Sequence, residues 1–149
     1  MKILLTLDDC TISEAVTDMM ITQIKTKDAV VRLLHVVEPF PENVAGKMGS
    51  REPPDFVAAR LVQREHGKEL LARAAERLRS AGFKVTSSVE EGDARNVILN
   101  QAERWHADLI VLGSHGRTGL DRFLMGSVSE AVARHARCSV EIVRIHPAR

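Results

Sequence analysis

Residues 111–132, VLGSHGRTGLDRFLMGSVSEAV, contain the clearest pattern for chemistry in this chain: four glycines and three serines directly after an aliphatic run. Glycines leave backbone N–H groups uncovered, and the start of a helix adds free N–H donors and the positive end of its dipole. We therefore expect the segment to bind anionic oxygens, such as those of phosphate groups, where a helix begins near Gly126. The side chains that could assist are Ser127, Ser129, Arg117 and Arg122.

Each of these residues also has a structural explanation. Gly113 could end a strand, Gly119 could hold a left-handed turn, and Ser127 could cap its own helix. Taken one at a time, the structural explanation is favoured, whereas the set together favours a phosphate site. The spacing fits neither of two common phosphate motifs: no lysine stands before Ser127, as GxxxxGK[ST] requires, and the first three glycines are three residues apart, unlike GxGxxG.

The elements that must position this segment can be predicted from hydrophobic periodicity. Helical patterns run from Thr11, which with Glu14 forms a possible capping box, to about Ile24, and from about Asp55 to Ala81 before Gly82. Further helices are predicted after Asp93 and from Gly126-Ser127. Five apolar, β-branched runs between them predict strands, at 2–7, 30–37, 83–89, 108–112 and 140–145.

Strands that alternate with helices are typical of an α/β fold with a parallel sheet covered on both faces. The runs at 83–89 and 140–145 alternate apolar and polar residues, so we expect them at the edges of the sheet. Residues 38–56 hold four prolines and two glycines without periodicity, which predicts a mobile surface loop. This loop follows a strand, so it should lie at the carboxyl edge of the sheet, where such folds bind ligands.

Composition excludes several classes of protein. With 149 residues and 44% hydrophobic residues, we expect one domain over residues 1–149. A net charge of +1 and a shortage of aromatic residues argue against nucleic-acid binding. The first apolar run is too short to span a membrane and lacks a secretory cleavage site, and Cys10 and Cys138 form no CxxC pair, so a cytoplasmic location is expected.

The pattern G-x2-G-x9-G-[ST], met by Gly113, Gly116, Gly126 and Ser127, resembles the nucleotide-binding signature of the universal stress protein family. The resemblance continues through KILLTLDD, LLHVVEP, EEGDARNVI, ADLIVLGSHG and CSVEIVRI, in order along the chain. It implies a single-domain, Rossmann-like α/β fold, similar to the adenine nucleotide alpha hydrolases, with a five-stranded parallel sheet. It also implies ATP at the carboxyl edge, with ADP and AMP left open, Mg²⁺ or Mn²⁺ held through the phosphates, and a homodimer formed through Val140 to Ile145.

Carried over residue by residue, the resemblance implies that Asp8 meets the ribose or the adenine side and that Val36 contacts the adenine. Leu112 and Gly113 would line the path of the ribose and phosphates. The phosphates would be held by Gly116, Arg117, Gly126, Ser127 and Val128. The chain departs from many family members at Asp9-Cys10, where a second carboxylate would weaken anion binding unless a divalent cation intervenes.

Three functions follow as hypotheses. The first is an ATP-binding regulator of the stress response, in which nucleotide binding tunes conformation or assembly. The second is a slow ATPase or phosphotransferase that uses Arg117 and a metal ion, although no nucleophile and base pair stands out and His115 has equally good structural explanations. The third is an interaction module that binds no nucleotide and whose glycines are only architectural.

Overall fold

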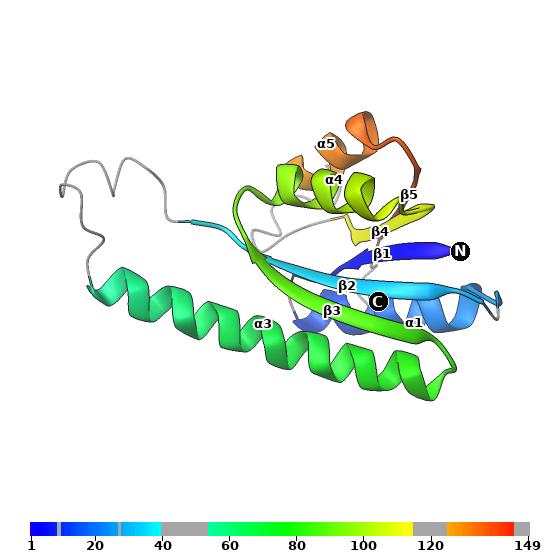
Figure 1. Cartoon of the computed structure of the whole chain (residues 1–149), viewed down its shortest axis with the longest axis horizontal. Coiled ribbons are helices and arrows are strands. Elements are labelled where there is room, and N and C mark those ends of the chain that lie inside the picture. The colour runs from blue at the N-terminus through cyan, green and yellow to red at the C-terminus, as the bar shows by residue number, and fades with distance from the viewer. Residues whose placement is uncertain (9, 27, 40–53, 115–124, 145–149) are drawn as a thin grey trace, which may run out of the picture.

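A computed structural model of the chain describes residues 1–8, 10–26, 28–39, 54–114 and 125–144 (Figure 1). Strands and helices alternate along the chain, and the strands form one five-stranded sheet, so the predicted α/β fold is confirmed. In chain order the elements are β1 (Lys2–Thr6), α1 (Cys10–Gln23), β2 (Val30–Val37), α3 (Pro54–Ser80), β3 (Lys84–Glu91), α4 (Ala94–Trp105), β4 (Leu109–Gly113), α5 (Ser127–His135) and β5 (Ser139–Val143).

The sheet is parallel throughout and has the strand order β3-β2-β1-β4-β5. Ile3 of the central strand pairs with Val31 on one side and with Leu109 on the other. β3 and β5 are the edge strands, as their alternating sequences predict. From β1 the chain adds β2 and β3 on one side of the sheet, and then β4 and β5 on the other side of β1. Such a reversal of strand order leaves a crevice at the carboxyl ends of the adjacent strands β1 and β4.

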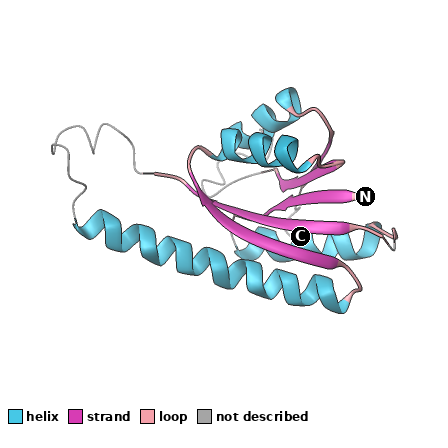
Figure 2. Cartoon of the chain, in the orientation of Figure 1, coloured by secondary structure: helices cyan, strands magenta, loops and turns pink. Residues whose placement is uncertain are grey.

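Helices cover both faces of the sheet, with α1 and α3 on one face and α4 and α5 on the other (Figures 1 and 2). Alternate strand residues feed two cores: Ile3 and Leu5 pack against α1 and α3, whereas Leu4 packs against α4 and α5. Burial of these aliphatic side chains is the main force that fixes the helices on the sheet. The carboxyl edge is therefore bordered by helices from both layers.

The helix boundaries follow local signals with one correction. Gly82 ends α3 with φ of +96°, a conformation that suits glycine, and the Asp93 side chain accepts a hydrogen bond from the Asn96 N–H at the start of α4. α1 already begins at Cys10, so Thr11 lies inside the first turn and the predicted capping box is wrong. Of the predicted loop at 38–56, α3 takes the last three residues, and residues 40–53 lie outside the described parts.

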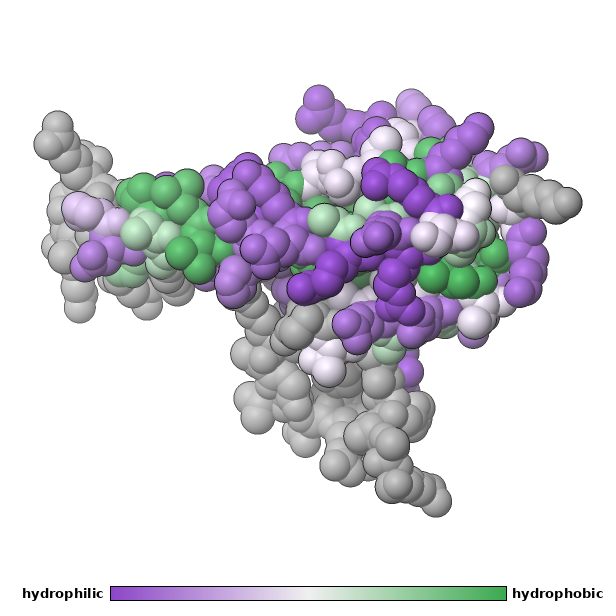
Figure 3. Space-filling model, turned by 90° about the horizontal axis from the view of Figure 1, so that it is seen from below, coloured by the Kyte–Doolittle hydropathy of each residue, from purple (hydrophilic) through white to green (hydrophobic). Residues whose placement is uncertain are grey.

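The N-terminal end of α3 carries an apolar patch on its outward side (Figure 3). Val57, Leu61 and Val62 are exposed to 37%, 58% and 56%. The second half of the same helix buries Leu70, Leu71 and Leu78 against the sheet. The first half of α3 therefore extends past the main core toward the carboxyl edge, with Gln63 on its half-buried side.

Candidate functional site

A cavity of about 320 Å³ lies at the carboxyl edge of the sheet. This volume is within the range of small-molecule sites. It is bordered by the ends of β1, β2 and β4, by the first turns of α1, α4 and α5, and by α3. Its lining consists of Thr6, Leu7, Asp8, Ile12, Ser13, Val16, Leu34, Val36, Val37, Glu38, Gln63, Ala94, Ile98, Leu112, Gly113, Gly126, Ser127, Val128 and Ser129.

The structure brings the predicted site residues together wherever it describes them. Four separate segments of the chain supply them to this one cavity, since they come from β1, β2, β4 and α5. Gly116, Arg117 and Arg122, together with His115 and Gly119, lie outside the described residues. The predicted residues that line the cavity are Asp8, Val36, Leu112, Gly113, Gly126, Ser127 and Val128.

The N-terminus of α5 borders the cavity. Gly126 is the N-cap, with φ of −60° and ψ of 152°, and among the described residues no side chain caps this helix end. Ser127 is therefore the first helical residue and not the cap. The first N–H groups of a helix have no partner within the helix, so the turn that starts at Ser127 offers donors and a positive dipole end to the cavity.

Hydrogen bonds hold this helix end against the sheet. The Gly126 N–H donates to the Ser114 carbonyl at 2.8 Å, and the Ser114 N–H donates to the Val143 carbonyl of β5 at 2.9 Å. The Ser129 hydroxyl, a predicted donor to phosphate, instead donates to the Gly113 carbonyl at 2.8 Å. Ser129 thus ties α5 to the end of β4, and its hydroxyl proton is already used.

The middle of the cavity is aliphatic. Leu34 and Val36 of β2, Leu112 of β4 and Ile98 of α4 all contribute to its lining. His35 between the two β2 residues is buried, and its Nδ1 donates to the Leu7 carbonyl at 2.8 Å, which fixes the carboxyl end of β1 against β2. Flat apolar ligand groups suit such walls, because their burial is favourable and requires no polar partner.

Two carboxylates border the cavity, Asp8 at the end of β1 and Glu38 just after β2. Glu38 accepts a hydrogen bond from the Ala94 N–H at 3.3 Å, at the first turn of α4. The lining, as far as it is described, includes no lysine or arginine. An anionic ligand would therefore need a cation of its own or one supplied by residues outside the described ranges.

A hydrogen-bonded pair of side chains lies beside this rim. Asp93 binds the Arg95 side chain, and this contact together with the Asn96 N–H lowers the pKa of the Asp93 carboxyl below its ordinary value. The carboxylate is thus held in its charged form at neutral pH, at the positive end of α4.

Sequence reasoning missed Ser13, Glu38 and Gln63 among the lining residues. Glu38 carried a usable signal, because it directly follows a strand that ends at the ligand-binding edge. Ser13 and Gln63 carried none, since both stand within helical patterns whose rotation about the axis cannot be read from the sequence. Their placement depends on how α1 and α3 pack together.

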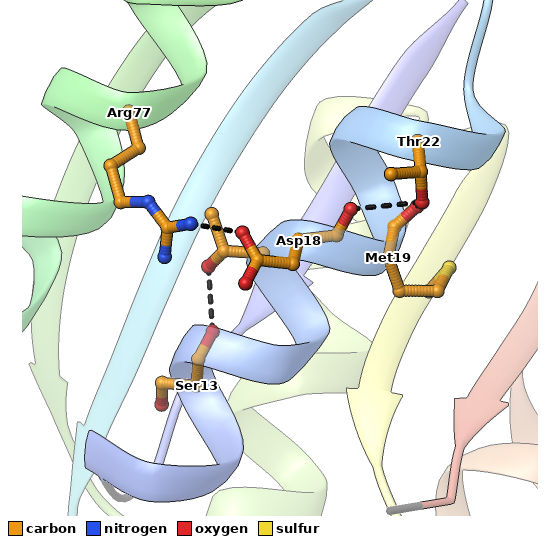
Figure 4. A network of polar contacts seen from close by, with 6 residues as sticks. Ser13, Asp18, Met19, Thr22 and Arg77 are labelled. Atoms are coloured by element: carbon orange, nitrogen blue, oxygen red, sulfur yellow. Dashed lines mark hydrogen bonds and ion pairs between the residues drawn. The ribbon is translucent and has the colours of Figure 1, made fainter.

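An ion pair connects α1 and α3 near Ser13 (Figure 4). It joins Arg77 of α3 to Asp18 of α1. Within α1, the Thr17 hydroxyl donates to the Ser13 carbonyl at 2.6 Å. The hydroxyl oxygen of Ser13 itself is buried without a hydrogen-bond partner among the described residues.

The described residues show neither a cluster of metal ligands nor a membrane-spanning helix. In the described ranges, no three histidine, cysteine, aspartate or glutamate side chains are grouped so that they could hold a metal ion. The helices within those ranges include none with the length and apolar character needed to cross a bilayer.

The sequence profile of the Universal stress protein family matches residues 1–144. The chain belongs to the universal stress protein family. A universal stress protein of Methanocaldococcus jannaschii is 34% identical over 143 residues, which cover 96% of this chain and 81% of the relative. Universal stress protein A homolog 2 of Coxiella burnetii is 42% identical over 122 residues, or 80% of this chain and 77% of that protein.

Solved structures share this universal stress protein fold. Hypothetical protein MJ0577 superposes with a TM-score of 0.83 at 26% identity, covering 99% of this chain and 97% of the other. A family member from Arabidopsis thaliana with AMP bound gives a TM-score of 0.69 at 21% identity, over 97% and 92% of the two chains. Two more universal stress proteins, solved with cAMP and with dAMP, give TM-scores of 0.64 and 0.65 at 20% and 19% identity.

Proposed function

We propose that this chain binds an adenine nucleotide, ATP above all, in the cavity at the carboxyl edge of its sheet. One observation carries the proposal: every described residue that the family signature assigns to the nucleotide lines this single cavity, although the residues come from four segments of the chain. The AMP, cAMP and dAMP complexes of proteins with the same fold support the choice of an adenine nucleotide.

The lining divides in the way that a nucleotide requires. Phosphate oxygens would accept hydrogen bonds from the amides at Gly126, Ser127 and Val128, where the α5 dipole is positive. The adenine would lie against Val36, and the Asp8 carboxylate suits the hydroxyl groups of the ribose. Leu112 and Gly113 would border the path between them. Gly116 and Arg117, outside the described residues, are proposed as further phosphate contacts.

A divalent cation completes the proposed site. Asp8 and Glu38 bring negative charge to a cavity that would hold a triphosphate, and no described lining residue is cationic. Mg²⁺ or Mn²⁺ bound to the phosphates would relieve this repulsion, and Mg²⁺ commonly binds proteins through one or two carboxylates plus substrate phosphates. ATP is therefore expected to bind more tightly with Mg²⁺ than without it.

We propose a regulatory role in the cytoplasmic stress response for the bound nucleotide. A ligand shifts a protein toward whichever state binds it more tightly, so turnover is not required. The cavity joins both helical layers, because α1 and α3 line it from one face and α4 and α5 from the other. A nucleotide that contacts both layers would favour the arrangement in which they are closest.

The test is calorimetric titration of the nucleotide-stripped protein with ATP, ADP and AMP, each with and without Mg²⁺, beside the variant Gly126→Val. The φ and ψ of Gly126 are available to any residue, so valine strains no backbone there but places a branched side chain at the phosphate end of the cavity. We expect the Kd for ATP to rise at least about tenfold, which corresponds to about 1.4 kcal/mol.

Ala133→Val is the matched control, since it adds the same kind of bulk to the exposed side of α5. It should bind ATP as the unaltered chain does. If a folded Gly126→Val variant and the control bind ATP with equal affinity, the N-terminus of α5 is not part of the ATP site. No binding of any of the three nucleotides at millimolar concentration would contradict the proposed function itself.

A further inference from the structure

The α1 and α3 side of the cavity presents two polar side chains, Ser13 and Gln63. Ser13 is 3% exposed, and its Oγ makes no hydrogen bond within the described structure. Buried polar groups in native proteins are nearly always paired, so this free hydroxyl indicates a polar ligand group on the α1 and α3 side. The Gln63 carboxamide is half-buried in the same lining and is the longer of the two side chains.

Packing of α3 on β2 fixes the height of Gln63 above the sheet. A side-chain carbon added to Gly67 would overlap the His35 ring, so these two residues are in direct contact. α3 connects two parallel strands and runs against them, which places Gln63 closer to the carboxyl edge than Gly67 by about 6 Å. Two strand residues span about the same length. Gln63 therefore lies level with Val37, at the end of β2.

This position is opposite to the phosphate end of the cavity. The free amides belong to α5, in the helical layer on the other face of the sheet, whereas Gln63 belongs to the α1 and α3 layer. The aliphatic lining residues Leu34, Val36 and Leu112 belong to the α4 and α5 cluster, on the same face as these amides. A nucleotide with its phosphates on α5 and one face of its base against these residues would turn an edge of the base toward the α1 and α3 side, where Gln63 lines the cavity.

A carboxamide matches one edge of adenine. It offers an N–H donor beside a carbonyl acceptor, and adenine presents the N7 acceptor beside the N6 amino donor, a pairing that glutamine makes with adenine elsewhere. Guanine and hypoxanthine present two acceptors on the same edge, so a carboxamide satisfies only one of them. We propose that Gln63 binds the N6 and N7 atoms of the base and thereby selects adenine; this inference rests on the nucleotide-binding function proposed above.

The experiment compares binding of ATP, 7-deaza-ATP and ITP to the whole chain and to Gln63→Leu. 7-deaza-ATP lacks the N7 acceptor, and ITP replaces the N6 amino group by an oxygen. The unaltered chain should bind both analogues more weakly than ATP. Gln63→Leu should bind ATP about 5- to 100-fold more weakly, the range that a bidentate base contact supplies, and should no longer distinguish ATP from 7-deaza-ATP.

Gln101→Leu is the matched control, because Gln101 is also a half-buried helical glutamine but does not line the cavity. It should keep both the ATP affinity and the preference over 7-deaza-ATP. Gln63→Glu is a second variant: the carboxylate retains an acceptor and loses the donor to N7, so it too should lose that preference.

Three results would overturn the inference. If Gln63→Leu keeps both the ATP affinity and the preference for ATP over 7-deaza-ATP, Gln63 does not contact the nucleotide. If it keeps the preference but weakens ATP and 7-deaza-ATP by the same factor, Gln63 only supports the cavity by packing. If the unaltered chain binds ATP and 7-deaza-ATP equally, no group reads N7. Failure of the unaltered chain to bind any nucleotide is distinct from these, since it contradicts the proposed function and the inference together.

Discussion

At the residue scale, the N-termini of α4 and α5 beside the cavity differ in whether protein side chains accept hydrogen bonds from their first N–H groups. At α4, Glu38 accepts from Ala94 at 3.3 Å and Asp93 accepts from Asn96 at 3.2 Å, so the protein's own carboxylates satisfy the helix start. At α5, Gly126 brings no side chain, and no described side chain caps the helix. We therefore propose that the α4 dipole serves stability and the α5 dipole serves a ligand.

Asp93→Ala should lower the free energy of unfolding by about 1 kcal/mol, because it removes the cap of α4. Asp93→Asn should cost less at neutral pH, since asparagine keeps the capping acceptor and loses only the exposed ion pair with Arg95. Urea denaturation at pH 7 measures both. Equal losses for the two variants would show that charge, and not capping, is what Asp93 supplies.

The pKa of Asp93 adds a pH dependence to this comparison. The hydrogen bond from Arg95 lowers this pKa in the folded state, so the charged carboxylate contributes stability at pH values above the ordinary aspartate pKa of about 3.9. That contribution is lost as the pH falls through the lowered folded-state pKa. The stability advantage of the unaltered chain over Asp93→Asn should therefore shrink as the pH is lowered from 7 toward 3.

Gly126 could be predicted from the glycine and serine pattern, and Val36 and Leu112 from the family resemblance; all three line the cavity. They meet there because parallel strands bring their carboxyl ends to one edge of the sheet whatever the details of packing. Ser13 and Gln63 could not be predicted. Their side chains reach the cavity only through the rotation and height of α1 and α3, which depend on contacts distant in sequence such as Arg77 with Asp18.

At the element scale, the contact of α3 with β2 sets one wall of the cavity. Gly67 lies in the middle of a 27-residue helix, where glycine is intrinsically unfavourable, and the His35 ring occupies the space that a side chain would take. His35 in turn holds the Leu7 carbonyl. Gly67 is a poor helix former, but it allows α3 to approach β2 closely. This close approach brings Gln63 to the edge of the cavity.

Gly67→Ala should destabilise the protein by about 1 to 2 kcal/mol, because overpacking against the buried ring outweighs the gain in helix propensity. Glu69→Ala on the exposed side of α3 should change stability by less than about 0.5 kcal/mol. Thermal unfolding of both variants, repeated with His35→Ala, completes the comparison. When His35 is also replaced by alanine, Gly67→Ala should no longer lower the stability of the protein. If the loss of stability is unchanged, the added side chain does not clash with the His35 ring.

Element types and the two edge strands followed from the sequence, since aliphatic runs of strand length alternate with helical periods and the two runs that alternate apolar and polar residues are the edges. The start of α1 did not follow. A Thr-x-x-Glu pattern predicts a helix that begins after Thr11, yet the helix begins at Cys10. Helix ends are defined only to within one or two residues, so a local capping pattern cannot fix the exact first residue.

At the scale of the whole molecule, the order of the strands places the cavity and exposes β5. The cavity lies where the chain reverses its direction of growth across the sheet, and β5 is the edge strand beyond β4. An unpaired strand edge invites pairing with another chain. We propose that this edge, Val140 to Ile145, forms a homodimer; Ile145 lies outside the described residues.

Ile142→Pro tests this assembly. The Val143 carbonyl points inward, where Ser114 donates to it, so the backbone groups of Ile142 point to the open side of the strand. Proline there removes an outward N–H without removing a bond to β4. Light scattering should find a dimer for the unaltered chain and a monomer for a folded variant. A monomeric unaltered chain at every concentration would contradict the proposed dimer.

The most direct measurement of the central claim is a crystal structure of the chain grown with ATP and Mg²⁺. We predict the triphosphate at the N-terminus of α5, against the amides of Ser127 and Val128, and the adenine between Val36 and Gln63. A nucleotide bound elsewhere, or a cavity that stays empty at saturating ATP, would contradict the assignment of this edge of the sheet as the nucleotide site.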